Sequence, residues 1–290
     1  ADSGSSRNST VKQTVGFAFF DAGPADTSTA SDAALLKDAL REAAPQLKRA
    51  LGLSKEQTKT LELDTAGMRI IREAAEEGSP EALTILARSY ERGIGVDKDL
   101  VTATVYYIRA SRMSSPRAPR LLARLMEQPG FFDELKFRTA RHDIDAEVAW
   151  AALSALKIDY LMTQKEGFIT EKQALEFLTK AAAANHVQGL IELGLCYYSG
   201  RWVQEDRRQA LALWARAGTL GSHEANTRIA TLAVRSEKDP KKLSAAIADL
   251  EQASQKGSVL AQVALGYCYE TGVGVTKKTS EAVRLYRSSA

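Results

Sequence analysis

The chain has 290 residues, of which 44% are hydrophobic and 26% are charged, so it holds enough apolar material for a folded body but exceeds the usual size of one compact domain. Its 39 basic and 36 acidic residues leave a net charge of +3, too small to indicate a nucleic-acid partner. The longest apolar runs are of the size of Val15 to Phe20, whereas a membrane span needs about 18 residues, so no span is predicted.

Residues 1–30 are predicted to form a flexible N-terminal segment, because Ser, Thr, Asp, Ala and Gly dominate it without a helical period. The opening run ADSGSSRNST begins at Ala1 and has the small polar composition that removal of a signal peptide leaves. An artificial truncation at the same place would look identical. Of these two interpretations the sequence favours export, and we expect a periplasmic or secreted protein.

Residues 31–64 are predicted to form N-terminal helices. After a Ser-Asp start, apolar residues recur at helical spacing at Ala34, Leu35, Ala39, Leu40 and Ala43. Pro45 bends or ends this helix, and a second short helix is expected toward Leu51.

Residues 65–290 are predicted to form an array of helix pairs. A small residue recurs near the start of the first helix of each unit, at intervals of 36, 34, 37, 36 and 36 residues, at Ala82, Ala118, Ala152, Gly189, Ala225 and Ala261. A period of about 36 residues is the sequence signature of an all-α solenoid of helix-turn-helix repeats.

The units agree in their side chains as well as in their spacing. The same four slots hold Leu193, Gly194, Tyr197 and Gly200 in one unit, Leu86, Ala87, Tyr90 and Gly93 in another, and Leu265, Gly266, Tyr269 and Gly272 in the last. The small residue lets two helices approach closely, and the tyrosine fills the space one turn later. The glycine of the turn suits a left-handed helix C-terminus.

The pattern AxxxL[GA]xxYxxGxGVxxDxxxAxxYYxxA in these units closely resembles the Sel-1-like repeat family, a relative of the tetratricopeptide repeats. The resemblance is strong for the units at Ala82, Gly189 and Ala261 and weaker for the other three, whose turns differ. It implies a right-handed α-solenoid that serves as a protein-interaction scaffold and has no catalytic residues of its own.

The common catalytic and metal-binding motifs are missing, since the sequence has no GxxxxGK[ST], GxSxG, HExxH or CxxC. His142 with Asp143 and Asp145 could form a weak cation site, but carboxylates at the start of a helix are the commoner explanation for such a cluster. We therefore expect no enzyme activity, no metal and no cofactor. Cys196 and Cys268 occupy the same slot of two units and are expected to be free, buried thiols.

Side chains that the first helices direct to the inside of the curve form the predicted partner-binding face. Its early part is basic, with Arg88, Arg120 and Arg124, and its later part is apolar or aromatic, with Ile191, Leu195, Tyr198, Val263 and Tyr267. An apolar stripe beside a charged one is typical of a peptide groove. A register shift of one residue would instead place these side chains in the core, and the arginines also suit a solvated surface.

Trp202 is a separate candidate, because it replaces the turn glycine found at Gly95 and Gly274 in the related units. It either covers the neighbouring loop or stands at the rim as a binding residue.

The sequence as a whole predicts a non-enzymatic scaffold or adaptor that binds a protein or peptide partner on the concave face, in the bacterial envelope. Two alternatives remain open. The chain is a homo-oligomeric structural or envelope-assembly component that stacks through an uncapped C-terminal repeat, or it regulates a cell-wall or secretion enzyme.

Overall fold

The structure of the protein is a computed structural model that describes residues 65–156 and 168–289. The helices in residues 65–156 are α3 (Thr65–Glu76), α4 (Pro80–Arg92), α5 (Leu100–Arg112), α6 (Ala118–Met126), α7 (Phe131–Ala140) and α8 (Ile144–Leu156). They are followed by α9 (Glu171–Ala183), α10 (Val187–Ser199), α11 (Arg207–Thr219), α12 (His223–Ser236), α13 (Pro240–Gln255), α14 (Val259–Thr271) and α15 (Thr279–Ser288). None of these described helices is long and apolar enough to cross a membrane. The boundaries expected at residues 30 and 64, and the helices between them, lie outside the described residues.

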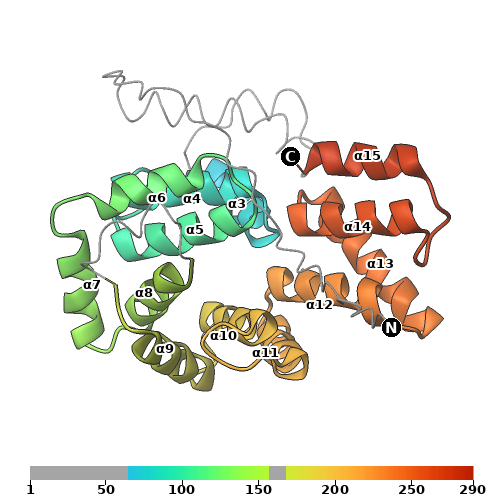
Figure 1. The fold of residues 1–290 in the computed structure, drawn as a ribbon. Coiled ribbons are helices and arrows are strands. Elements are labelled where there is room, and N and C mark those ends of the chain that lie inside the picture. Colours follow the sequence, from blue (N-terminus) through green and yellow to red (C-terminus); the bar gives the residue numbers. More distant parts are fainter. Residues whose placement is uncertain (1–64, 157–167, 290) are drawn as a thin grey trace, which may run out of the picture. The chain divides into compact units, whose positions relative to one another are not determined.

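The helices pack as consecutive pairs. Contacts join α4 with α5, α8 with α9, α10 with α11, α12 with α13 and α14 with α15, and Figure 1 shows α14 and α15 side by side. Each pair then packs on the next, as α9 does on α10 and α13 on α14. The predicted all-α helical-repeat solenoid is confirmed.

The turn inside a well-formed unit has the local causes expected from its sequence. Gly93, Gly200 and Gly272 end α4, α10 and α14 in the left-handed conformation, with φ of 71°, 66° and 83°. Asp99 and Asp206 cap α5 and α11, and each side chain accepts hydrogen bonds from two backbone N–H groups. These residues fix where the second helix begins.

The turn between units repeats as well. The backbone N–H of its N-cap residue donates to the carbonyl five residues earlier, as from Ser79 to Ala74 and from Ser222 to Ala217, both at 3.0 Å. The N-cap side chain accepts the backbone N–H three residues later. The residues in this capping position are Ser79, Ser115, Asp143, His186, Ser222 and Ser258. Their spacings are 36, 28, 43, 36 and 36 residues.

These spacings correct one predicted position. Ala152 is the wrong start for its unit, because the Asp143 carboxylate accepts the N–H of Ala146, which places Ala146 in the slot. The preceding unit is short, since α6 and α7 have only 9 and 10 residues, and the connection from α8 to α9 is long. The short unit and the long connection compensate each other in chain length, so the sum of the two spacings is the same as in the predicted register and the period looks even.

Large and small residues interlock inside each unit, as expected. Tyr107 on α5 is fully buried, and its hydroxyl donates to the Glu91 carboxylate on α4 at 2.5 Å. Burial, followed by the charge of Glu91, raises the pKa of Tyr107 far above its ordinary value. Trp214 on α11 is 2% exposed, and its indole N–H donates to the carbonyl of Ile191 on α10 at 3.2 Å. A buried side-chain hydrogen bond therefore joins the two helices in each of these pairs, α4–α5 and α10–α11.

Candidate functional site

The residues predicted to bind a partner lie on first helices or in one turn. Arg88 is on α4, Arg120 and Arg124 on α6, Ile191, Leu195 and Tyr198 on α10, Trp202 in the turn after α10, and Val263 and Tyr267 on α14. Among the described residues they do not form one continuous surface, and three environments are found.

The first environment is the interior. Ile191 is 1% exposed and belongs to the apolar cluster between α8 and α11. The core alternative raised by the sequence therefore holds for Ile191, which is removed from the candidate surface. Leu195 and Tyr198 are half-buried against the same cluster, and the Tyr198 ring lies 5.7 Å from the Trp214 ring.

The second environment is the basic part on α4 and α6. Arg120 and Arg124 are exposed, as a solvated or partner-binding stripe would be. Arg88 differs from them, because its guanidinium is 12% exposed and lies 3.4 Å from the buried Glu91 carboxylate. Arg88 is thus tied to the polar core of its own unit.

The third environment is the surface that α12 and α14 share, defined here as the α12–α14 surface of Arg235, Val263 and Tyr267. The Arg235 guanidinium lies 5.5 Å from the centre of the Tyr267 ring. Val263, one helical turn before Tyr267, is 38% exposed. Arg235 is exposed and forms no ion pair with a carboxylate of the described residues. The surface therefore combines an accessible aliphatic side chain, an aromatic ring and an exposed guanidinium that lies over that ring.

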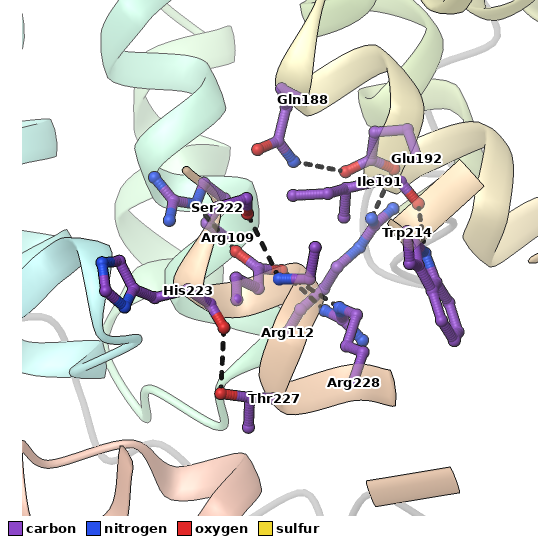
Figure 2. A network of polar contacts seen from close by, with 12 residues as sticks. Arg109, Arg112, Gln188, Ile191, Glu192, Trp214, Ser222, His223, Thr227 and Arg228 are labelled. Atoms are coloured by element: carbon purple, nitrogen blue, oxygen red, sulfur yellow. Dashed lines mark hydrogen bonds and ion pairs between the residues drawn. The ribbon is translucent and has the colours of Figure 1, made fainter. Parts of the chain in front are cut away.

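Contacts that the sequence did not predict close the first unit onto later ones. Arg109 on α5 donates from Nε to the Glu224 carboxylate on α12 at 3.1 Å. Arg228, on the same helix as Glu224, donates to the other carboxylate oxygen at 2.8 Å. Figure 2 shows Arg109 and Arg228 directed toward the same point from two different helices. The three side chains form a buried ionic triad.

Burial would raise the pKa of the Glu224 carboxyl, but the guanidiniums of Arg228 and Arg109 outweigh it and lower that pKa to about 2. Burial likewise disfavours the charge on Arg109, and the Glu224 carboxylate reverses this, so the pKa of Arg109 is raised. The Glu224 carboxylate and the Arg109 guanidinium are consequently both charged near neutral pH.

Two further contacts reinforce the closure. Arg112 on α5 forms an ion pair with Glu192 on α10, and Gln188 donates to the same carboxylate at 2.9 Å. Lys256, at the end of α13, donates to Glu77 after α3 at 2.7 Å. Residues 77–112 thereby contact residues 188–256 directly, whereas a simple repeat array joins each unit only to its neighbours.

One sequence signal points to this closure. Glu192 is 1% exposed and stands in a slot that is apolar in four other units, with Ile85, Leu121, Ala149 and Ala264, and charged in one, with Arg228. A glutamate at such an apolar position requires a buried partner, because an unpaired buried charge is costly. The identity of that partner, Arg112, depends on contacts 80 residues apart and could not be read from the repeat.

Trp202 occupies a strained backbone position. Its φ is 62°, close to the 69° of Gly95 and 67° of Gly274 in the same slot, and its side chain is half-buried against the cluster of α10 and α11. A side chain in this conformation costs about 1–2 kcal/mol relative to glycine. The packing of the indole therefore offsets a backbone strain that the related units avoid.

We expect Trp202→Gly to be more stable than Trp202→Ala by about 1 kcal/mol, because both lose the indole but only alanine keeps the strain. Urea denaturation of the two variants measures the difference. An alanine variant that equals or exceeds the glycine variant would contradict the strained geometry.

The two carboxylates of the candidate cation site, Asp143 and Asp145, have other partners. Asp143 caps α8 and pairs with Arg138 at 2.6 Å, while Asp145 accepts from His186 at 2.8 Å. In the described ranges no three His, Cys, Asp or Glu side chains are grouped to hold a metal. Cys196 and Cys268 are buried, free thiols, and burial raises the pKa of Cys196 to about 12.

Comparison with known proteins adds the family of the repeats. No curated protein matches the chain. One similar solved structure is the Sel1 repeat protein from Oxalobacter formigenes, which is 20% identical with a TM-score of 0.44, over 88% of this chain and 98% of that one. Another is c5321 of uropathogenic Escherichia coli, described as a protective antigen with an SLR fold. It is 19% identical with a TM-score of 0.39, over 89% of this chain and 62% of that one.

The Sel1 repeat profile matches residues 80–115, 171–186, 187–222 and 259–290. These stretches contain the helix pairs α4–α5, α10–α11 and α14–α15, whose first helices end at Gly93, Gly200 and Gly272, together with α9. The resemblance found in the sequence is confirmed, and this chain carries Sel1 repeats at these four stretches.

Proposed function

We propose that this protein is a non-enzymatic scaffold that binds a protein or peptide partner through the α12–α14 surface. Sel1 repeats are a protein-interaction repeat type, which supports the general role. The observation that carries the specific proposal is the Arg235 guanidinium over the Tyr267 ring beside the exposed Val263. Tyrosine and arginine are enriched at binding hot spots, and an accessible aliphatic neighbour supplies apolar area for burial.

The closure contacts explain why this surface is preferred over the rest of the predicted face. Glu192 and Glu224 lie on first helices, but both carboxylates already form ion pairs within the chain. Glu192 pairs with Arg112, and Glu224 pairs with Arg109 and Arg228. Side chains on that part of the face are therefore occupied within the chain. Arg235, Val263 and Tyr267 remain available to a partner without breaking a buried ion pair.

Site-specific photocrosslinking from position 263 in the native host tests this proposal, and position 283 provides a matched control. Val263 and Val283 are 38% and 40% exposed, but Val283 lies on α15. We expect a discrete adduct from position 263 only, and its loss when Arg235 and Tyr267 are both changed to alanine. With the purified partner, Tyr267→Ala should weaken binding about tenfold or more.

Adducts of equal yield from both positions, or an adduct that survives the double alanine change, would show that the α12–α14 surface is not the binding site. An adduct with the mass of two copies of this chain would instead favour the self-assembly alternative. The location in the bacterial envelope stays a prediction, and cell fractionation would test it by showing in which compartment the protein is found.

A further inference from the structure

A pocket of about 640 Å³ lies between the first unit and the turns that join later units. Glu76 of α3 and Tyr106 of α5 line one side. The other side comes from three successive inter-unit turns, through Ile144 at the start of α8, Val187 at the start of α10 and Leu220 before α12. Arg109 and Ser222, both labelled in Figure 2, belong to the same lining, so the pocket depends on the closure contacts.

The pocket has an apolar lining that the repeat does not require. Leu220 is 47% exposed, one of the few large apolar side chains in the described residues with such exposure. Its slot, two residues before the N-cap, holds Glu77, Met113, Arg141, Ala184 and Lys256 in the other turns. Folding therefore does not demand leucine here. Ile144 and Val187 extend the apolar area, because both are only half-buried.

The charged side chains that the pocket lining exposes are carboxylates. The side chain of Arg109 is only 9% exposed, because it is directed to the buried Glu224 carboxylate. The His186 ring accepts the N–H of Gly189 at Nδ1, at 3.1 Å, and its Nε2 lies 2.8 Å from the Asp145 carboxylate. Glu76 is exposed and forms no ion pair with a described residue, and Asp145 is 61% exposed. The carboxylates of Glu76 and Asp145 are thus the charged groups that the rim presents to solvent.

We propose that this pocket binds a segment of a partner protein in which an apolar side chain stands beside a lysine or arginine. Its volume lies within the range of about 300–1,000 Å³ that binding pockets commonly have. The apolar side chain contacts Leu220, Ile144 and Val187, and the cation lies between the two rim carboxylates. Charge complementarity of this kind selects the partner and its orientation. The inference does not depend on the α12–α14 surface.

Fluorescence anisotropy with two labelled six-residue probes tests the proposal on the full chain. One probe has two central leucines flanked by lysines, and in the other glutamates replace the lysines. We expect the lysine probe to bind wild type about tenfold more tightly than the glutamate probe, with a preference that shrinks at high salt. Leu220→Asp should weaken binding of the lysine probe about tenfold or more. Val283→Asp, at a similarly exposed valine on α15, should leave it unchanged.

Glu76→Lys provides a second variant that leaves the apolar lining intact, and Glu134→Lys on α7 is its control, because both glutamates are exposed. Glu76→Lys should weaken the lysine probe and strengthen the glutamate probe, whereas Glu134→Lys should change neither. Equal binding of the two probes, no detectable binding of the lysine probe to wild type, or control variants that act as strongly as the pocket variants would each overturn the proposal.

Discussion

Glu224→Gln is expected to lower the free energy of unfolding by about 3–5 kcal/mol at neutral pH, because it removes the one carboxylate that faces both Arg109 and Arg228. The side chains of these arginines are only 9% and 12% exposed, so water does not replace the lost partner. Urea denaturation measures the loss, and amide exchange should show faster opening at α5 and α12 than elsewhere. The exchange pattern is needed because repeat arrays do not always unfold in two states.

Glu281→Gln is the control for this change, since Glu281 also forms an ion pair, with Arg284, but on the exposed surface of α15. Its replacement should not shift the urea midpoint measurably, because exposed ion pairs contribute little. If Glu224→Gln were equally silent, the triad would not join the first unit to α12.

The same carboxylate gives stability a defined dependence on pH. The pKa of Glu224 is lowered from 4.5 to about 2 in the folded chain. A lowered folded pKa contributes stability that is fully present above the unfolded value, near pH 4.5, and is lost as pH falls toward 2. The size of this contribution is about 3 kcal/mol. Calorimetry between pH 7 and pH 2.5 should show that wild type loses this contribution to its stability as the pH falls, whereas Glu224→Gln, which lacks the carboxylate, does not lose it.

The helix pairs could be predicted from the sequence because each of their determinants is local. Gly200 ends a helix, Asp206 begins the next, and Gly194 admits Trp214, all within one unit of the chain. The one misplaced unit shows the limit of this reasoning. Intervals of 34 and 37 residues looked regular, although the N-cap hydrogen bonds place the true spacings at 28 and 43.

The candidate surfaces were less predictable because they depend on contacts between distant units. Ile191 and Val263 were assigned to one stripe by register, yet one is 1% exposed and the other 38%. What separates them is packing between units, because Ile191 lies in the apolar cluster of α8 to α11, whereas Val263 on α14 stays accessible. No single repeat contains that information. Glu192 and Arg228, charged in a slot that is apolar in the other units, indicate that part of the inner face is buried.

Gly194→Ala is expected to destabilise the chain by about 2–4 kcal/mol, even though alanine favours helices more than glycine does. A Cβ at this position would lie 2.3 Å from the indole nitrogen of Trp214. The ring would have to move, and its hydrogen bond to the Ile191 carbonyl at 3.2 Å would be lost. Thermal or urea denaturation measures the effect.

Gly218→Ala is the matched control, because Gly218 is also helical but its added Cβ would meet only the side-chain tip of the exposed Asn226. That tip can rotate away, so this variant should be neutral or gain up to about 1 kcal/mol from helix propensity. The first unit supplies a rescue, since Ala87 there packs in a unit whose buried aromatic is Tyr107 rather than tryptophan. Adding Trp214→Tyr to Gly194→Ala should therefore recover part of the lost stability. If the double variant is no more stable than the single one, the cost of Gly194→Ala does not arise from the indole, and the close approach of α10 and α11 is not what requires glycine at this position.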